Sequence, residues 1–141
     1  MSNLSKQVRQ KVWVRASFRC EYCQSSVRLT GMPLVIDHIQ PQTLQGSDGL
    51  DNLAAACYRC NEFKGARTSG LDPETQTDII LLNPRQHRWS EHLGWDETGT
   101  LVGGLTPIGR ATVAVLRLNN DDVVAARVIW VKWGWHPPQL N

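Results

Sequence analysis

The residues best suited to chemistry lie in the first half of the chain, close to two cysteine pairs. Asp37 and His38 stand side by side at the end of an apolar run, and Asn61 directly follows Cys60. Carboxylate and amide oxygens suit a hard divalent ion such as Mg²⁺. A neutral histidine beside them can take a proton from water at physiological pH. This combination indicates a hydrolytic site assembled around a metal ion.

All four cysteines belong to Cys-x-x-Cys units, namely Cys20 with Cys23 and Cys57 with Cys60. Each unit presents two thiolates from one tight turn, and two such turns can complete a tetrahedral zinc site. Disulfides, redox chemistry and unrelated buried thiols are the competing interpretations. Disulfides are rare in cytosolic proteins, and cysteines three residues apart bridge each other poorly. We therefore predict a structural Zn²⁺ site that stabilises the fold and does no chemistry of its own, since all its ligand positions are filled.

The hydrophobic pattern predicts the elements that would position these residues. Ser5 is a good N-cap for a helix over about residues 6–17. The apolar, β-branched segment 32–39 favours a strand, and residues 53–57 favour a short return strand. Between them, residues 40–52 hold proline, glycine, serine and aspartate, which are typical of a loop. A helix is expected to begin at the second cysteine pair and to end near Gly65.

The second half of the chain has a different pattern. Residues 69–78 are polar and contain Pro73, which indicates a connector, and residues 92–106 predict a hairpin. Thr106 followed by Pro107 is a helix-start signal. A further helix is predicted from Asn120 to about Trp135.

Composition limits the functional classes. The chain has 141 residues, 41% of them hydrophobic, and no apolar run approaches the roughly 18 residues that span a membrane. The polar N-terminus lacks a signal-peptide core, so we expect a cytoplasmic protein without membrane contact. Residues 1–70 carry nine Lys/Arg against five Asp/Glu, a balance that suits a polyanion. We expect residues 1–70 to form the functional core and residues 71–141 an extension packed on it.

The run CEYC, DHIQP and LDNLAAACYRCNEFKG resembles the HNH endonucleases, also called ββα-metal or His-Me finger nucleases, in the form that carries a four-cysteine zinc site. The resemblance covers about residues 15–67. It implies an α+β fold with a ββα-metal core, an N-terminal helix and a C-terminal extension of a hairpin and helices.

The resemblance also implies catalytic roles. Asp37 and Asn61 would be ligands of a catalytic Mg²⁺ or Mn²⁺ ion, and His38 would be the general base. Asn52 would fix the loop that keeps His38 oriented. The family often has histidine at the position of Asn61, so this chain is an HNN variant, in which an amide oxygen favours Mg²⁺ or Mn²⁺ over zinc.

The function predicted from these residues is metal-dependent hydrolysis of DNA, double-stranded by expectation, to 5′-phosphate and 3′-hydroxyl ends. Lys64 and Arg67 lie on or just past the expected helix and are candidates for phosphate contacts. The alternative is a non-catalytic, zinc-stabilised module that binds nucleic acid or protein. It accounts for the cysteines and the basic charge, but leaves Asp37, His38 and Asn61 unexplained. The oligomeric state is left open by the sequence.

Overall fold

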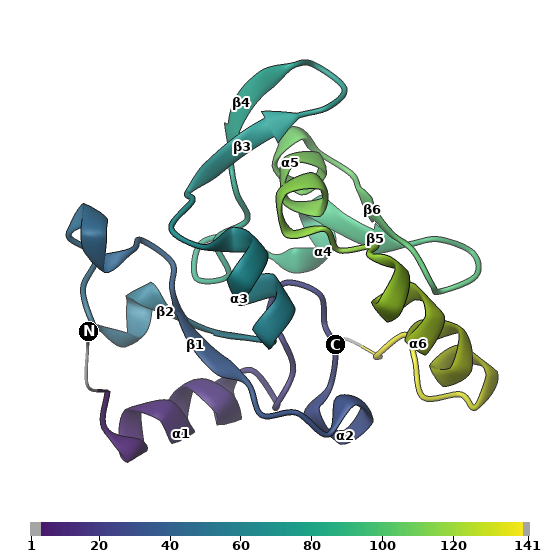
Figure 1. The fold of residues 1–141 in the computed structure, drawn as a ribbon, viewed down its shortest axis with the longest axis horizontal. Coiled ribbons are helices and arrows are strands. Elements are labelled where there is room, and N and C mark those ends of the chain that lie inside the picture. The colour runs from purple at the N-terminus through teal and green to yellow at the C-terminus, as the bar shows by residue number, and fades with distance from the viewer. Residues whose placement is uncertain (1–3, 140–141) are drawn as a thin grey trace. The chain divides into compact units, whose positions relative to one another are not determined.

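The computed structural model describes residues 4–139, which fall into two compact units (Figure 1). The first unit comprises Met1–Thr68 and Asn83–Gln86, and the second comprises Ser69–Leu82 and His87–Asn141. The change of unit at Thr68 lies close to the boundary expected at residue 70, although four later residues return to the first unit. That the extension packs on the core remains a prediction.

The first unit is built on a ββα arrangement. Strands β1 and β2 pair antiparallel, with Val35 opposite Ala56 and His38 opposite Leu53, and helix α3 follows β2 directly. Two short 3₁₀ turns, Gln42–Leu44 and Leu50–Asn52, shape the loop between the strands. The helices and strands are α1 (Lys6–Arg15), α2 (Val27–Thr30), β1 (Val35–His38), β2 (Leu53–Ala56) and α3 (Tyr58–Lys64).

Local sequence accounts for the ends of these elements. The Ser5 hydroxyl accepts a hydrogen bond from the backbone N–H of Val8, which confirms the predicted cap of α1. Helix α3 ends at Gly65, whose φ of 54° lies in the region that glycine adopts without strain. All four residues of β2 are buried, so this strand lies in the core of the first unit.

The described residues of the second unit form two hairpins and three helices, and one hairpin differs from the sequence expectation. The segment predicted as a connector forms strands that pair antiparallel, because the Asp72 carboxylate accepts from the N–H of Glu74 and closes a tight turn at Pro73. The hairpin predicted over 92–106 is confirmed. The elements are β3 (Ser69–Asp72), β4 (Thr77–Ile80), α4 (Trp89–His92), β5 (Leu93–Trp95), β6 (Val102–Gly104), α5 (Pro107–Leu116) and α6 (Asp121–Lys132).

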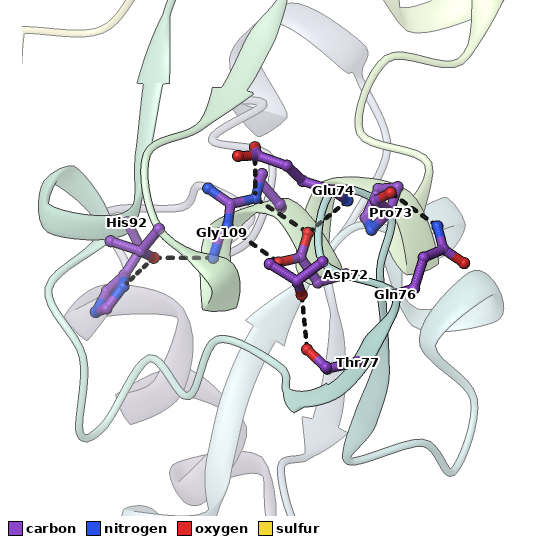
Figure 2. Close-up of polar contacts among 10 residues, drawn as sticks. Asp72, Pro73, Glu74, Gln76, Thr77, His92 and Gly109 are labelled. Carbon is purple, nitrogen blue, oxygen red and sulfur yellow. Dashed lines mark hydrogen bonds and ion pairs between the residues drawn. The ribbon is translucent and has the colours of Figure 1, made fainter.

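Helix α5 joins the two hairpins of the second unit. Its predicted cap is confirmed, since the Thr106 hydroxyl accepts from the N–H of Gly109. The helix can approach the end of α4 closely because Gly109 lacks a side chain: a Cβ there would lie 1.8 Å from the carbonyl oxygen of His92 (Figure 2). Helix α6 ends at Lys132, three residues before the predicted Trp135, and Gly134 follows with φ 75°.

A bidentate ion pair fastens the β3–β4 turn to α5. The Arg110 side chain donates from Nε to Asp72 Oδ1 and from a terminal nitrogen to Oδ2, both at 3.0 Å. Asp72 is fully buried and also accepts from the Thr75 hydroxyl, so its two oxygens are saturated (Figure 2). The Arg110 hydrogen bonds hold the pKa of Asp72 well below its usual range.

The first testable consequence concerns acid stability. A depressed carboxyl pKa stabilises the folded state above the unfolded value of about 3.9, and this contribution is lost as pH falls below it. The melting temperature of Asp72→Asn should therefore lie below that of the wild type by a constant gap between about pH 5 and 7, and the gap should narrow below about pH 4.

Tryptophan fluorescence is the suitable measurement, because five of the six tryptophans follow residue 88 and so report on the second unit. Asp78→Asn, on the same hairpin, is the control and should show no such narrowing. A gap that persists unchanged into strong acid would contradict the assigned role of Asp72.

None of the helices within residues 4–139 combines the length and apolar character that crossing a membrane requires.

Candidate metal centre and active site

The four cysteines form one cluster in the first unit. Cys20 and Cys23 come from the turn after α1, whereas Cys57 caps α3 and Cys60 lies in its first turn. Their four sulfur atoms all lie within 4.8 Å of one another, and all four cysteines are free thiols. The sequence prediction that the two pairs share one site is confirmed.

The cluster fits a tetrahedral zinc ion. Zn–S bonds of about 2.3 Å place ligand sulfurs about 3.8 Å apart, and the Cys23 and Cys57 sulfurs are 3.7 Å apart. Backbone N–H groups of Tyr22 and Cys23 point at Cys20 Sγ, and that of Cys60 points at Cys57 Sγ, each at 3.4 Å. Such donors stabilise thiolates, so this site could hold a metal ion such as zinc.

The turn between Cys20 and Cys23 is bonded to β2. The N–H of Glu21 donates to the carbonyl of Ala55 at 2.9 Å, and the Glu21 carboxylate accepts from the N–H of Ala55 at 2.8 Å. Arg85 forms an ion pair with the same carboxylate. The next residue, Tyr22, is thereby directed into the interior, where its side chain is fully buried.

Asp37 is the acceptor for two buried donors. The Tyr22 hydroxyl donates to Asp37 Oδ2 at 2.6 Å, and the Lys64 ammonium donates to Oδ1 at 3.2 Å. Asp37 is only 3% exposed, and this burial raises its pKa, against the opposing effects of Lys64 and Tyr22. Burial and the neighbouring charge of Asp37 raise the pKa of Tyr22 well above that of an ordinary phenol, so Tyr22 keeps its proton and acts as a donor.

Lys64 has a different role from the phosphate contact expected from the sequence. Its side chain is 1% exposed, and its ammonium also donates to the carbonyl oxygens of His38 and Ile39 at 3.4 and 3.3 Å. The sequence does not show which face of α3 carries Lys64. In the structure this face is turned toward β1 and away from solvent. Its charge therefore neutralises Asp37 and is not available at the surface.

His38 points to the opposite side of β1 from Asp37, as successive residues of a strand do. Its Nε2 atom lies 2.8 Å from Asp48 Oδ1. The His38 side chain is 16% exposed and that of Asp48 is 53% exposed, so the pair lies at the surface of the first unit. Sequence analysis did not single out Asp48, because nothing in its spacing links a loop aspartate to a histidine ten residues earlier.

Asn52 spans the loop that carries Asp48. Its Oδ1 accepts from the N–H of Gln40 at 2.8 Å, and its Nδ2 donates to the carbonyls of Gln40 and Ser47 at 3.0 and 2.8 Å. Gly46 is required here, since a Cβ would lie 1.7 Å from the Gln40 carbonyl oxygen. Asn52 thus acts on the backbone of the loop and makes no hydrogen bond to His38 itself.

The remaining predicted residues lie on and after α3. Asn61 is half-buried in α3, three residues before Lys64. Arg67 is exposed in the segment that follows the helix. Asp37 and Lys64 therefore meet between β1 and α3.

The Cys20–Cys23 turn precedes β1, and Cys57 and Cys60 stand where β2 leads into α3. Residues 20–67 match the HNH endonuclease family. This match confirms the resemblance drawn from the motifs. The mixed helix and strand content, with small sheets and a cysteine cluster inside the HNH domain, also confirms the predicted fold class.

Two curated relatives are similar to parts of the chain. The Septu protein PtuB of Bacillus mycoides (strain KBAB4) is 28% identical over 108 residues, which cover 59% of this chain and 36% of PtuB. The CRISPR-associated endonuclease Cas9 of Corynebacterium diphtheriae is 40% identical over 52 residues, which cover 36% of this chain and 5% of Cas9. The chain thus spans well under half the length of either relative. No solved structure is significantly similar to it.

The cysteine cluster generates a second prediction. Cys57→Ser should lose bound zinc and unfold the HNH domain, because structural zinc contributes about 10–16 kcal/mol in small zinc modules, which exceeds the stability of most domains. Zinc content per chain by elemental analysis and helix content by circular dichroism would measure both effects. A zinc-free Cys57→Ser protein with an intact HNH domain would contradict a structural role for the metal.

The third prediction concerns the buried ion pair. Replacing Lys64 by methionine leaves the Asp37 charge buried without its partner, which should lower the free energy of unfolding by about 3–5 kcal/mol. Lys11→Met, on the exposed side of α1, is the matched control and should change it by less than about 0.5 kcal/mol. Urea denaturation with saturating zinc measures both variants, and equal midpoints would show that the pair has no net effect.

Proposed function

We propose that the HNH domain is a metal-dependent endonuclease that hydrolyses phosphodiester bonds in double-stranded DNA, by nicking or by cutting both strands, with His38 as the general base. The observation that carries the proposal is the placement of His38. Inside a segment that matches the HNH endonucleases, this histidine is partly exposed at the end of a strand, and the loop beside it is fixed by Asn52.

The reaction requires few protein groups. His38 takes a proton from a water molecule, and the water oxygen attacks the phosphorus of the scissile phosphodiester. The bond to the 3′-oxygen breaks, its electron pair stays on that oxygen, and a proton from solvent completes the 3′-hydroxyl while the new bond leaves a 5′-phosphate. Proton transfer by a positioned histidine contributes about 10²–10⁴-fold to such a rate.

Asp37 and Asn61 are the proposed ligands of Mg²⁺ or Mn²⁺. The donor chemistry fits, since a carboxylate oxygen and an amide oxygen are ligands that hard ions prefer. In the structure Asp37 Oδ1 accepts from the Lys64 ammonium and Oδ2 from the Tyr22 hydroxyl, so the ion would have to replace Lys64 at Oδ1. When bound, the ion would offset the charge that develops on the phosphate oxygens.

Arg67 is the proposed phosphate contact that remains after Lys64 is reassigned. It is exposed, and it follows the helix that carries Asn61. A backbone contact of this kind carries no sequence information, so we expect little sequence preference from the HNH domain itself. The free thiols favour action in the cytoplasm, where cysteines stay reduced.

The fourth prediction tests the activity. With Mg²⁺ or Mn²⁺, the wild type should convert supercoiled plasmid to nicked or linear DNA, and His38→Ala should be slower by about 10²–10⁴-fold. Gel electrophoresis of end-labelled plasmid measures the rate and the chemistry of the ends. His87→Ala, in the second unit, is the histidine control and should retain activity.

Two outcomes would contradict the proposal. An intact plasmid with every protein, while zinc is bound, would favour the non-catalytic module. Cleavage that persists in His38→Ala would instead remove His38 from the role of base.

A further inference from the structure

His38 and Asp48 form a close pair that the family roles leave unexplained. The 2.8 Å separation of His38 Nε2 and Asp48 Oδ1 is a normal hydrogen-bond distance. Gln42 Nε2 donates to the same carboxylate oxygen at 3.5 Å. Asp48 is therefore the acceptor for the ring of the proposed base.

The pair depends on a loop that is fixed on both sides of Asp48. The preceding carbonyl, that of Ser47, accepts from Asn52 Nδ2 at 2.8 Å. Two residues before Asp48, Gly46 donates its N–H to the carbonyl of Pro41 at 2.9 Å. After Asp48, the Gly49 carbonyl accepts from the N–H of Asn52 at 2.9 Å. Asn52 thus orients His38 indirectly, by holding the segment that presents Asp48.

The chemistry of the two groups determines which ring nitrogen holds hydrogen. An ionised carboxylate only accepts, so Nε2 must carry the proton that the pair shares. In a neutral ring the other nitrogen, Nδ1, then has the free lone pair. A carboxylate on one side of an imidazole fixes the tautomer and stabilises the cation that forms when the ring accepts a proton.

We propose that Asp48 is a positioning residue for His38, which holds the Nε2–H tautomer and makes Nδ1 the atom that takes the proton from water. The proposal rests on His38 acting as the base in the proposed nuclease reaction. Asp48 itself does not touch the reacting atoms. The alternative is an obstructive role for Asp48, in which Nε2 of His38 is the base and the Asp48 carboxylate competes with the attacking water for Nε2.

Nitrogen-15 NMR of histidine-labelled, zinc-loaded protein tests the pair without reference to activity. At a pH at which the ring is neutral, wild-type His38 should show a hydrogen-bonded Nε2–H proton, assigned by its absence in His38→Ala. Asp48→Ala should lose this signal. Asp51→Asn, an exposed aspartate of the same loop, should keep it. A wild-type ring protonated at Nδ1 alone, or an unchanged signal in Asp48→Ala, would overturn the proposal.

Plasmid nicking gives the second measurement. Asp48→Ala and Asp48→Asn should lower kcat by about 10–100-fold with KM unchanged, as is typical when the partner of a functional histidine is removed. Asp48→Glu, which keeps the carboxylate, should recover most of kcat, and Asp51→Asn should resemble the wild type. A kcat that rises in Asp48→Ala would establish the obstructive role instead.

The two measurements separate this inference from the proposed function. If the wild type does not cleave DNA but the Nε2–H signal depends on Asp48, the orientation of His38 stands and the nuclease proposal fails. If the wild type cleaves and His38→Ala does not, while Asp48→Ala changes neither signal nor rate, the nuclease proposal stands and the role of Asp48 fails.

Discussion

The cluster of four cysteine sulfurs, which could hold a metal ion such as zinc, is the constraint on which the arrangement of the HNH domain depends. The cluster joins the turn at Cys20–Cys23 to the start of α3, two segments separated by 33 residues. Fixing the ends of that span places β1 and β2 between the turn and the helix, so few other contacts are needed to set their positions. The first unit is small, and a structural metal is one of the devices by which small natural domains supplement a limited apolar core. Tyr22 illustrates the result, because it lies between two cysteines and reaches Asp37 only while the turn holds its shape.

A second constraint follows from burying charge next to that cluster. Asp37 and Lys64 are both almost fully buried, and desolvating two ions costs several kcal/mol each before their attraction is counted. The Tyr22 hydroxyl and the carbonyl oxygens of His38 and Ile39 provide the additional hydrogen bonds that such a pair needs. A hydrophobic pair of similar volume would stabilise the fold at least as well.

Sequence reasoning was most effective where a residue acts on its own neighbours. The caps Ser5 and Thr106 and the Cys-x-x-Cys turns depend on side chains within three residues, so spacing alone was sufficient. The β3–β4 hairpin was missed because polar residues and Pro73 suggested a connector, whereas Asp72 closes the turn and Arg110 of α5 fixes it from 38 residues away. Lys64 was misjudged for a related reason. A basic residue near a predicted site suggests a phosphate contact, and only the rotation of α3 shows that it faces the interior.

The two carboxylates near His38, those of Asp37 and Asp48, lie in different environments. Asp37 precedes His38 on the same strand, so the alternation of β1 turns it inward to Tyr22 and Lys64, where solvent is excluded. Asp48 comes from a loop and meets the ring at the surface, where water can reach the pair. In the proposed reaction Asp37 would hold the metal ion and Asp48 would orient His38, so the two acids would not compete for the same histidine. This division depends on β1 as much as on the residue types, since a shift of one residue along the strand would turn His38 into the interior and Asp37 toward water.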